Sequence, residues 1–325
     1  MKILVTGGAG FIGSNFILYM MKKYPDYKIV NLDNLTYAGN LENLRLVEKN
    51  KNYKFIKGNI CDKKIVKNAM KGCDIVVHFA AESHVDNSIT DPESFIYTNI
   101  VGTSVLLEVA KDLKIKRFHH VSTDEVFGTL PLKDKSKKFT EETPYSPRSP
   151  YSASKASSDH LVRAYIETYG FPATISNCTN NYGPFQFPEK IIPLFIINSL
   201  QDKPLPIYGK GHAVRDYLYV EDHCRALDII LHKGKLGETY CIGGNAEKDG
   251  NQIADTILKN LKKPKNLKKF VTDRQGHDMR YAMDYSKITR ELKWGPSVKF
   301  EDGIAQTIKW YKENKLWWKK LQKKK

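Results

Sequence analysis

The sequence predicts an α/β protein with a doubly wound parallel sheet and a smaller C-terminal substrate-binding lobe. Over residues 1–184, short apolar runs typical of buried parallel strands alternate with segments whose apolar residues recur at helical spacing. The first run, Ile3 to Val5, leads directly into a glycine-rich turn. Beyond residue 184 the chain is richer in proline, glycine and basic residues, which indicates a separate lobe of loops and short helices.

The glycine-rich turn has the spacing of a dinucleotide site. Three glycines, spaced three residues apart, follow the first strand, and a helical pattern begins at Phe11. Glycines permit a tight turn and close approach of the backbone, so that the helix N-terminus faces a pyrophosphate. A second strand over 27–33 ends at Asp33, twenty residues past Gly13, where such folds place the acid that binds the adenosine ribose. An acid repels a 2′-phosphate and no arginine follows it directly, so we expect NAD rather than NADP.

Four further strands are predicted over 53–60, 73–81, 117–122 and 173–178, and a helix is predicted over 99–113. Because the carboxyl ends of parallel strands meet at one edge of the sheet, the polar segments that follow them should face the cofactor. These segments are AAESHVD, STDE and NCTNNYGP. We therefore place an NAD-binding Rossmann-type domain at 1–184, to which segments near 210–243 return, and the substrate-binding lobe mainly at 185–325.

Two neighbouring carboxyl groups and a tyrosine–lysine pair carry the candidate chemistry. Asp124 and Glu125 follow the strand predicted over 117–122, where a pair of acids could serve as proton donor and acceptor. A helix predicted over 149–170 places Tyr151 and Lys155 one turn apart on one face. An ammonium group beside the phenol should lower its pKa, so that the phenol becomes a general base near neutral pH. The same spacing occurs elsewhere in this chain, so the pair gains weight from the dinucleotide site that precedes it.

The composition argues against several other classes of protein. The net charge is +16, and much of the excess lies in lysine-rich segments at 133–138, 259–269 and 317–325. No helix-turn-helix, zinc or RNA-binding motif accompanies them, so we expect a solvated surface and no nucleic acid. No apolar run is long enough for a membrane span, and the five cysteines lack metal-ligand spacing, as in a reduced cytoplasmic protein without a metal. The histidines of the predicted strands are expected to be structural: His78, His119 and His120.

Taken in order, these segments resemble the extended short-chain dehydrogenase/reductase family and, within it, the nucleotide-sugar 4,6-dehydratases. The resemblance runs through essentially the whole chain. It implies a nucleotide-sugar substrate, NAD as the cofactor, and a homodimer built from the helices near 99–113 and 150–170. The segments that carry it are TGGAGFIGS, LDNLTYAGN, AAESHVD, STDEVFG, YSASKASSDHLVRAY, NNYGPFQFPEKIIPL, LPIYGKG, VRDYLYVEDH and DRQGHD.

The resemblance also implies the roles of five side chains. Tyr151 would take the proton of the sugar 4-hydroxyl while C4 is oxidised, and Lys155 would hold the nicotinamide ribose and keep the phenol acidic. Thr123 would hydrogen-bond near the 4-oxygen. Glu125 would then remove the proton on C5, and Asp124 would protonate the departing 6-hydroxyl. NAD would end the cycle unchanged, so it would be catalytic rather than consumed.

The remaining site residues implied by the resemblance fall into two groups. Those expected along the cofactor, besides Tyr151 and Lys155, are Gly7, Gly10, Phe11, Ile12, Gly13, Asp33, Leu35, Thr36, Gly39, Asn59, Ile60, Ala80, Ala81, Ser83, Asn99 and Asn181. Those expected to face the nucleotide-sugar, with arginines suited to a diphosphate, are Ser83, Thr123, Asn180, Lys190, Ile191, Pro206, Tyr208, Arg215, Asp273, Arg274 and His277.

This sequence departs from the family pattern at a few positions. Asn59 stands where many members have an aspartate, Gln275 replaces a proline, and Ala246 and Gly250 replace asparagines, one of which Asn251 could supply. The resemblance implies dTDP-glucose as the substrate. UDP-glucose stays as the alternative, because one of these asparagines would contact the nucleotide. A 4-epimerase or a decarboxylase is a further alternative, although epimerases of this family lack the Asp-Glu pair and decarboxylases typically have serine for the aspartate. A non-catalytic dinucleotide-binding module would have no need of the complete set of catalytic side chains.

Overall fold

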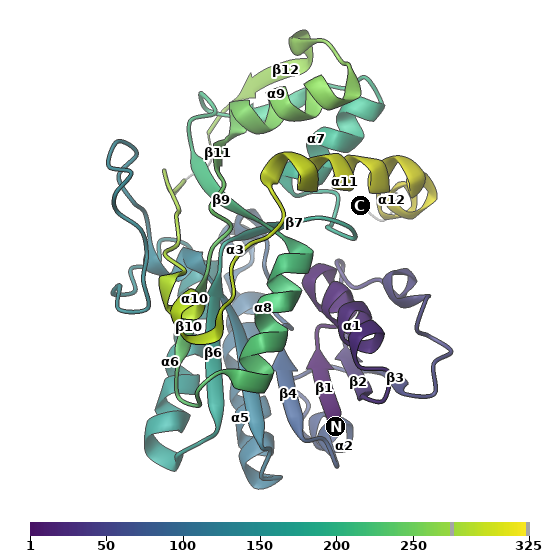
Figure 1. Ribbon diagram of the computed structural model, residues 1–325, viewed down its shortest axis with the longest axis vertical. Helices are drawn as coiled ribbons and strands as arrows, with labels where there is room; N and C mark the ends of the chain where they lie inside the picture. Colours follow the sequence, from purple (N-terminus) through teal and green to yellow (C-terminus); the bar gives the residue numbers. More distant parts are fainter. Residues whose placement is uncertain (274–275, 323–325) are drawn as a thin grey trace.

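The structure, a computed structural model, describes residues 1–273 and 276–322 and contains a seven-stranded sheet (Figure 1). The strand order is β10-β6-β5-β4-β1-β2-β3, and every neighbouring pair is parallel. The order reverses at β1, which lies between β4 and β2, and this confirms the predicted doubly wound fold class. The strands are β1 (Lys2–Thr6), β2 (Lys28–Asp33), β3 (Tyr53–Lys57), β4 (Ile75–His78), β5 (Arg117–Thr123), β6 (Ala173–Cys178) and β10 (Thr239–Ile242).

Helices cover both faces of this sheet, which explains the continuous apolar run of β1. Ile3 and Val5 belong to the core on one face, whereas Leu4 belongs to the core on the other, and all three are fully buried. Because side chains alternate along a strand, a strand covered on both faces needs apolar residues at every position. The covering helices are α1 (Phe11–Lys23), α8 (Val220–Lys233) and α10 (Ser286–Leu292) on one face, and α2 (Lys63–Met70), α5 (Gly102–Asp112) and α6 (Pro150–Tyr169) on the other.

A smaller lobe lies above the sheet in the view of Figure 1 and has its own apolar core. A three-stranded sheet, β11-β9-β7, and a parallel pair, β12-β8, contribute to it. The division at residue 184 stays a prediction; within the segment 210–243, β10 joins the main sheet, whereas β9 pairs within the lobe. The elements of the lobe are β7 (Asn180–Tyr182), α7 (Ile191–Leu200), β8 (Leu205–Tyr208), β9 (Val214–Tyr219), β11 (Glu247–Asp249), α9 (Gly250–Leu261), β12 (Lys268–Val271), α11 (Phe300–Glu313) and α12 (Lys315–Gln322).

Element boundaries differ modestly from those expected from the sequence. The helix predicted over 99–113 begins with a π-helical turn, η2 (Ile96–Val101), before α5. Helix α6 begins after Ser149, whose side chain accepts a hydrogen bond from Ser152 N, and ends at Gly170 in the left-handed conformation. In the described part of the chain, no helix has the length and apolarity that a membrane span requires. The remaining short elements are η1 (Leu41–Leu44), α3 (Val85–Thr90), α4 (Pro92–Phe95), η3 (Asp124–Phe127) and η4 (Lys265–Leu267).

The C-terminal helix α12 is tied to the glycine-rich turn through two hydrogen bonds. Trp317 Nε1 donates to Asn43 Oδ1 at 2.8 Å, and Asn43 Nδ2 donates to the carbonyl of Ala9 at 3.1 Å. Both side chains are buried, and Lys320 forms an ion pair with Glu42 at 2.5 Å next to them. The lobe therefore supports the turn from outside the main sheet.

We expect Trp317→Ala to lower the free energy of unfolding by about 3–5 kcal/mol, because it removes a buried ring and leaves a cavity. Urea denaturation measures the change. Leu316→Ala is the matched control: the neighbouring side chain is 78% exposed, so its removal should cost less than about 0.5 kcal/mol. Equal losses from the two substitutions would contradict the described packing of α12.

Candidate active site

A cavity of about 330 Å³ opens at the carboxyl ends of the strands, where β1, β2, β4, β5 and β6 end. Most of the residues expected along a cofactor line it, as do four of those expected to face the substrate: Ser83, Thr123, Asn180 and Lys190. The cofactor-side residues in its wall are Gly7, Gly10, Phe11, Ile12, Gly13, Asp33, Thr36, Gly39, Asn59, Ile60, Ala80, Ala81, Ser83, Tyr151, Lys155 and Asn181.

The glycine-rich turn has no room for side chains. Gly7 has a φ of +71°, and a Cβ atom there would lie 2.6 Å from Ala80 N. A Cβ atom on Gly13 would lie 2.4 Å from the carbonyl oxygen of Gly7. Asp33 fixes the turn against β2, because its carboxylate accepts from Ala9 N at 2.9 Å and from Leu35 N at 2.8 Å. Bare backbone at a helix start, with an acid at the end of β2, fits the phosphates and ribose of a dinucleotide.

Two predicted cofactor residues do not line the cavity. Asn99 is buried behind its wall, where its amide bonds to the backbone of Glu82 and to Ser154 Oγ. Leu35 has a φ of +55° and contributes its backbone N–H to Asp33. The cofactor-binding roles expected of Asn99 and Leu35 stay predictions; in this structure the two residues support the wall of the cavity through these hydrogen bonds.

The two neighbouring carboxyl groups have different surroundings. Asp124 is 1% exposed; its Oδ2 accepts from Thr179 Oγ1 at 2.9 Å and its Oδ1 from Thr123 Oγ1 at 3.3 Å. Burial first, and then the charge of Glu125, raise the pKa of Asp124 to about 8. Glu125 is less buried, and its backbone N–H donates to Thr123 Oγ1. Near neutral pH, Asp124 therefore carries a proton beside a second carboxyl group.

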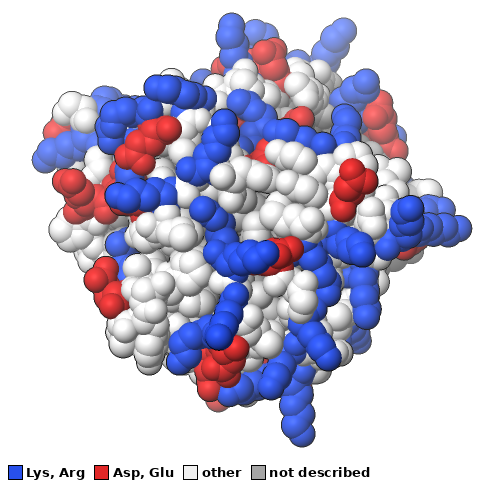
Figure 2. All heavy atoms as spheres, turned by 60° about the horizontal axis from the view of Figure 1, so that its bottom comes forward, with Lys and Arg blue, Asp and Glu red and all other residues white. Residues whose placement is uncertain are grey.

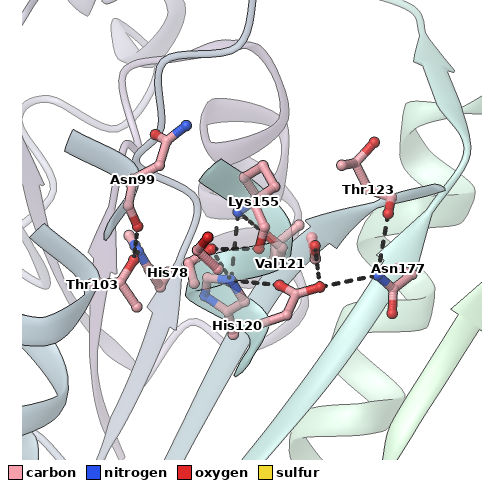
Figure 3. Close-up of polar contacts among 12 residues, drawn as sticks. His78, Asn99, Thr103, His120, Val121, Thr123, Lys155 and Asn177 are labelled. Carbon is pink, nitrogen blue, oxygen red and sulfur yellow. Dashed lines mark hydrogen bonds and ion pairs between the residues drawn. The ribbon is translucent and has the colours of Figure 1, made fainter. Parts of the chain in front are cut away.

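The tyrosine–lysine pair differs from the sequence-based expectation. Burial, followed by the charge of Glu125, raises the pKa of Tyr151 well above its usual value. Lys155 Nζ donates to the carbonyl of Val121 at 2.9 Å and lies 3.5 Å from His120 Nε2 (Figure 3). The pKa of the phenol is thus shifted in the direction opposite to the predicted one, because burial and the charge of Glu125 disfavour the phenolate.

The histidines in the strands are buried and bonded to hydroxyl groups. His78 lies between Thr6 Oγ1 at 2.8 Å and Thr103 Oγ1 at 3.0 Å. Thr103 donates to the carbonyl of Asn99, so it accepts from His78 Nε2–H, and Nδ1 accepts from Thr6 (Figure 3). His119 lies between the hydroxyls of Thr174 and Ser176. Within residues 1–273 and 276–322, no three His, Cys, Asp or Glu side chains group as metal ligands would.

Most of the predicted substrate residues of the lobe lie outside this cavity. Tyr208, Asp273 and His277 form one cluster, in which His277 Nδ1 lies 2.7 Å from Asp273 Oδ1 and the Tyr208 and His277 rings are 6.3 Å apart. Lys190 Nζ, within the cavity wall, donates to the carbonyl of Ser83 at 3.2 Å. Pro206 and Ile191 lie in β8 and at the start of α7, and Arg274 falls outside the described residues.

Arg215 is held by a residue that sequence reasoning missed. Its guanidinium group lies 4.2 Å from the centre of the Tyr281 ring and donates to the carbonyl of Val214. Tyr281 Oη donates to Asp278 Oδ2 at 2.5 Å, and the pKa of this phenol is raised by burial and then by Glu125. Tyr281 follows the DRQGHD segment by three residues, and this proximity was the one sign in the sequence that Tyr281 could belong to the substrate site. Further cavity residues that were not expected are Tyr37, Glu82, Ser122, Cys178, Thr179, Gln186, Phe187 and Glu189.

A dinucleotide crevice beside a Tyr-x-x-x-Lys pair defines an enzyme of the extended short-chain dehydrogenase/reductase class. A family profile described as GDP-mannose 4,6 dehydratase matches residues 4–307, and the chain belongs to this family. The predicted resemblance to nucleotide-sugar 4,6-dehydratases is confirmed.

Individual relatives are similar over nearly their full length. A dTDP-glucose 4,6-dehydratase of Escherichia coli is 51% identical over 349 aligned positions, covering 99% of this chain and 96% of the relative. The crystal structure of a dTDP-glucose 4,6-dehydratase from Bacillus anthracis in complex with NAD is 48% identical with a TM-score of 0.92, covering 99% of both chains. That of Streptomyces venezuelae with NAD and TYD bound is 46% identical with a TM-score of 0.95, covering 99% of this chain and all of the other.

The raised pKa of Asp124 gives a prediction for stability. Unfolded, this carboxyl group ionises near 3.8, whereas the folded protein holds the proton up to about pH 8. Between these values the folded form binds more protons, so the free energy of unfolding falls as pH rises. We expect Asp124→Asn to be neutral near pH 4 and increasingly stabilising up to about pH 8, as measured by urea denaturation across this range. A pH-independent difference, or one of opposite sign, would contradict the burial argument.

Proposed function

We propose that this chain is a dTDP-glucose 4,6-dehydratase, an NAD-dependent hydro-lyase that converts dTDP-glucose to dTDP-4-dehydro-6-deoxyglucose and water. One observation carries the proposal: a buried, protonated Asp124 beside Glu125 lines the same cavity as Tyr151 and Lys155. Elimination of water needs one acid and one base at adjacent carbon atoms, and this pair supplies both. The names and bound NAD of the relatives support the same assignment.

NAD fits the residues that are present. The phosphates would lie on the glycine-rich turn, the adenosine ribose on Asp33, and the nicotinamide ribose on Lys155. When bound, NAD accepts a hydride from C4 of the sugar and later returns it to C6. The positive nicotinamide ring also favours an ionised Tyr151, which burial alone disfavours.

The oxidation step depends on Tyr151, Thr123 and Lys155. Tyr151 takes the proton of the sugar 4-hydroxyl, and Thr123, which hydrogen-bonds to the phenol, stabilises its charged form. Lys155 is held by the carbonyl of Val121 at 2.9 Å at the base of the cavity. From this position in the cavity wall, Lys155 would bind the nicotinamide ribose close to the phenol of Tyr151.

The elimination step depends on the difference between the two carboxyl groups. A ketone at C4 acidifies the proton on C5, and Glu125 removes it. Asp124, which keeps its proton up to about pH 8, delivers it to the departing 6-hydroxyl. Thr179 and Thr123 hold this carboxyl group in place. Acid and base assistance of this kind is worth roughly 10²–10⁴-fold each.

The nucleotide part of the substrate would extend into the lobe. Arg215, stacked on Tyr281, and Lys190 would bind the diphosphate. The same role predicted for Arg274 falls outside the described residues. The cluster of Tyr208, Asp273 and His277 would lie beyond them. We also assign the enzyme to deoxysugar biosynthesis in the cytoplasm, as in dTDP-rhamnose formation.

A homodimer is part of the proposal. Apolar side chains remain exposed on η2 and on α6, which are in contact with one another: Ile96, Tyr97, Val101 and Tyr169. Such side chains on neighbouring helices would be covered by the same face of a second copy in a four-helix arrangement.

Incubation with dTDP-glucose and, separately, with UDP-glucose tests the function. We expect loss of one water from the dTDP-sugar and a new ketone, without added NADH, as followed by mass spectrometry. Faster turnover of UDP-glucose would change the nucleotide assignment. An unchanged mass with inversion at C4 would identify an epimerase, and no reaction of either substrate with NAD bound would overturn the proposal.

Glu125→Gln is expected to slow product formation roughly 10²–10⁴-fold, because the amide cannot remove the C5 proton. Oxidation at C4 should continue, so bound NADH should accumulate and be visible by its absorbance. Glu167→Gln, an exposed glutamate of α6, is the control and should leave the rate unchanged. Normal turnover by Glu125→Gln would exclude Glu125 as the base.

A further inference from the structure

A second buried carboxyl group, Asp159, lies one helical turn beyond Lys155 on α6 and has no exposed surface. Three donors from different parts of the chain reach its Oδ2: Ser122 Oγ at 2.7 Å, Tyr145 Oη at 2.8 Å and Asn177 Nδ2 at 3.3 Å. Its Oδ1 lies 3.1 Å from His120 Nε2. Asp159 is absent from the cavity wall, so it cannot touch a cofactor or a sugar there.

His120 lies between this carboxylate and the ammonium group of Lys155. The same Nε2 atom is 3.1 Å from Asp159 Oδ1 and 3.5 Å from Lys155 Nζ, and Figure 3 shows the imidazole directly below the lysine. Burial lowers the pKa of His120 to about 4, so the ring is neutral near neutral pH. The neutral ring therefore lies next to both charged groups through one nitrogen atom.

Lys155 is a buried ammonium group, and such a group loses its proton unless a negative charge compensates it. The titratable groups around it come from every neighbouring element: His78 on β4, His120 on β5, Asp124 and Glu125 on η3, Tyr151 and Asp159 on α6, and Cys178 on β6.

Most of these groups are neutral near pH 7. Asp124 holds a proton, and burial raises the pKa values of Tyr151 and Cys178. Glu125 is the base of the proposed elimination, so its charge changes during each turnover. The pKa of Asp159 is lowered despite its burial, by His120, Lys155 and Ser122. It is therefore the buried group whose negative charge persists through the cycle.

We propose that Asp159 is a positioning residue whose carboxylate is the permanent counter-charge of Lys155, acting across His120 to keep the lysine an ammonium group. The inference rests on the proposed function, in which a charged Lys155 holds the ribose and favours the phenolate of Tyr151. Ser122, Tyr145 and Asn177 hold the carboxylate at this place, and Asn177 also donates to the carbonyl of Thr123 at 3.1 Å. The same residue thus links the counter-charge to the end of β5.

The test measures C4 oxidation alone, as the absorbance of bound NADH in a single turnover of dTDP-glucose. Asp124→Asn serves as the background, because it stalls elimination and removes the titration of Asp124. In this background, oxidation should be lost at high pH, where Lys155 loses its proton. Asp159→Asn removes a nearby opposite charge, so it should lower the pH at which oxidation is lost by roughly 1–3 units. The KM for the sugar should stay unchanged, because Asp159 does not line the cavity.

Tyr145→Phe in the same background is the matched control, since it removes one donor to Asp159 but leaves the carboxylate and the ring in place. It should leave the pH profile where it is. If Asp159→Asn does not yield folded protein, Asp159→Glu carries the test: retention of the charge should keep the profile at its original pH. A profile that Asp159→Asn leaves unmoved, or that Asp159→Glu displaces, would overturn the inference. Absence of turnover by the unmodified protein would overturn the proposed function instead.

Discussion

Burial of the Asp124 carboxyl group at the end of β5 is the constraint on which the site depends. The strand delivers this residue into the cavity between Thr123 and Thr179, where ionisation would leave a charge with few donors and Glu125 beside it. The group therefore keeps a proton that a solvated aspartate would lose. The hydrogen bond from Thr179 lowers the pKa of Asp124, but burial and the charge of Glu125 outweigh it. The proposed chemistry uses the resulting difference between Asp124 and its neighbour.

The two buried carboxyl groups differ in charge because different numbers of hydrogen-bond donors reach them. Asp159 receives three donors on one oxygen and has His120 beside the other, so it stays charged. Asp124 receives hydroxyl contacts only, so it stays neutral. Both depend on β5 and β6, because Thr123 and Ser122 come from one strand and Asn177 from the other. Two neighbouring parallel strands thus supply contacts to both buried carboxyl groups near the tyrosine–lysine pair.

The sequence was informative where a chemical pattern coincides with a backbone requirement. The alternation of elements predicted the sheet, and the glycines with Asp33 predicted the dinucleotide crevice. The glycines were informative because only a residue without a side chain fits a turn that passes so close to Ala80. The contacts of Asn99 and Leu35 with the chain itself could not be predicted, because a linear motif does not tell whether a side chain or its backbone faces a cavity. The pKa of Tyr151 was predicted in the wrong direction because burial is a property of the assembled fold. Tyr281 and Asp159 are ordinary residues in sequence and gain their meaning from contacts more than 30 residues away, with Arg215 and Ser122.

Infrared spectroscopy of the protein at neutral pH would test the central claim most directly. The carbonyl stretch of a protonated carboxyl group is distinct from that of a carboxylate, and the difference between the unmodified protein and Asp124→Asn assigns it. We predict a band of the protonated form that Asp124→Asn lacks and that disappears as the pH rises through about 8. The absence of such a band at neutral pH would mean that Asp124 is ionised, and the assignment of acid and base would fail.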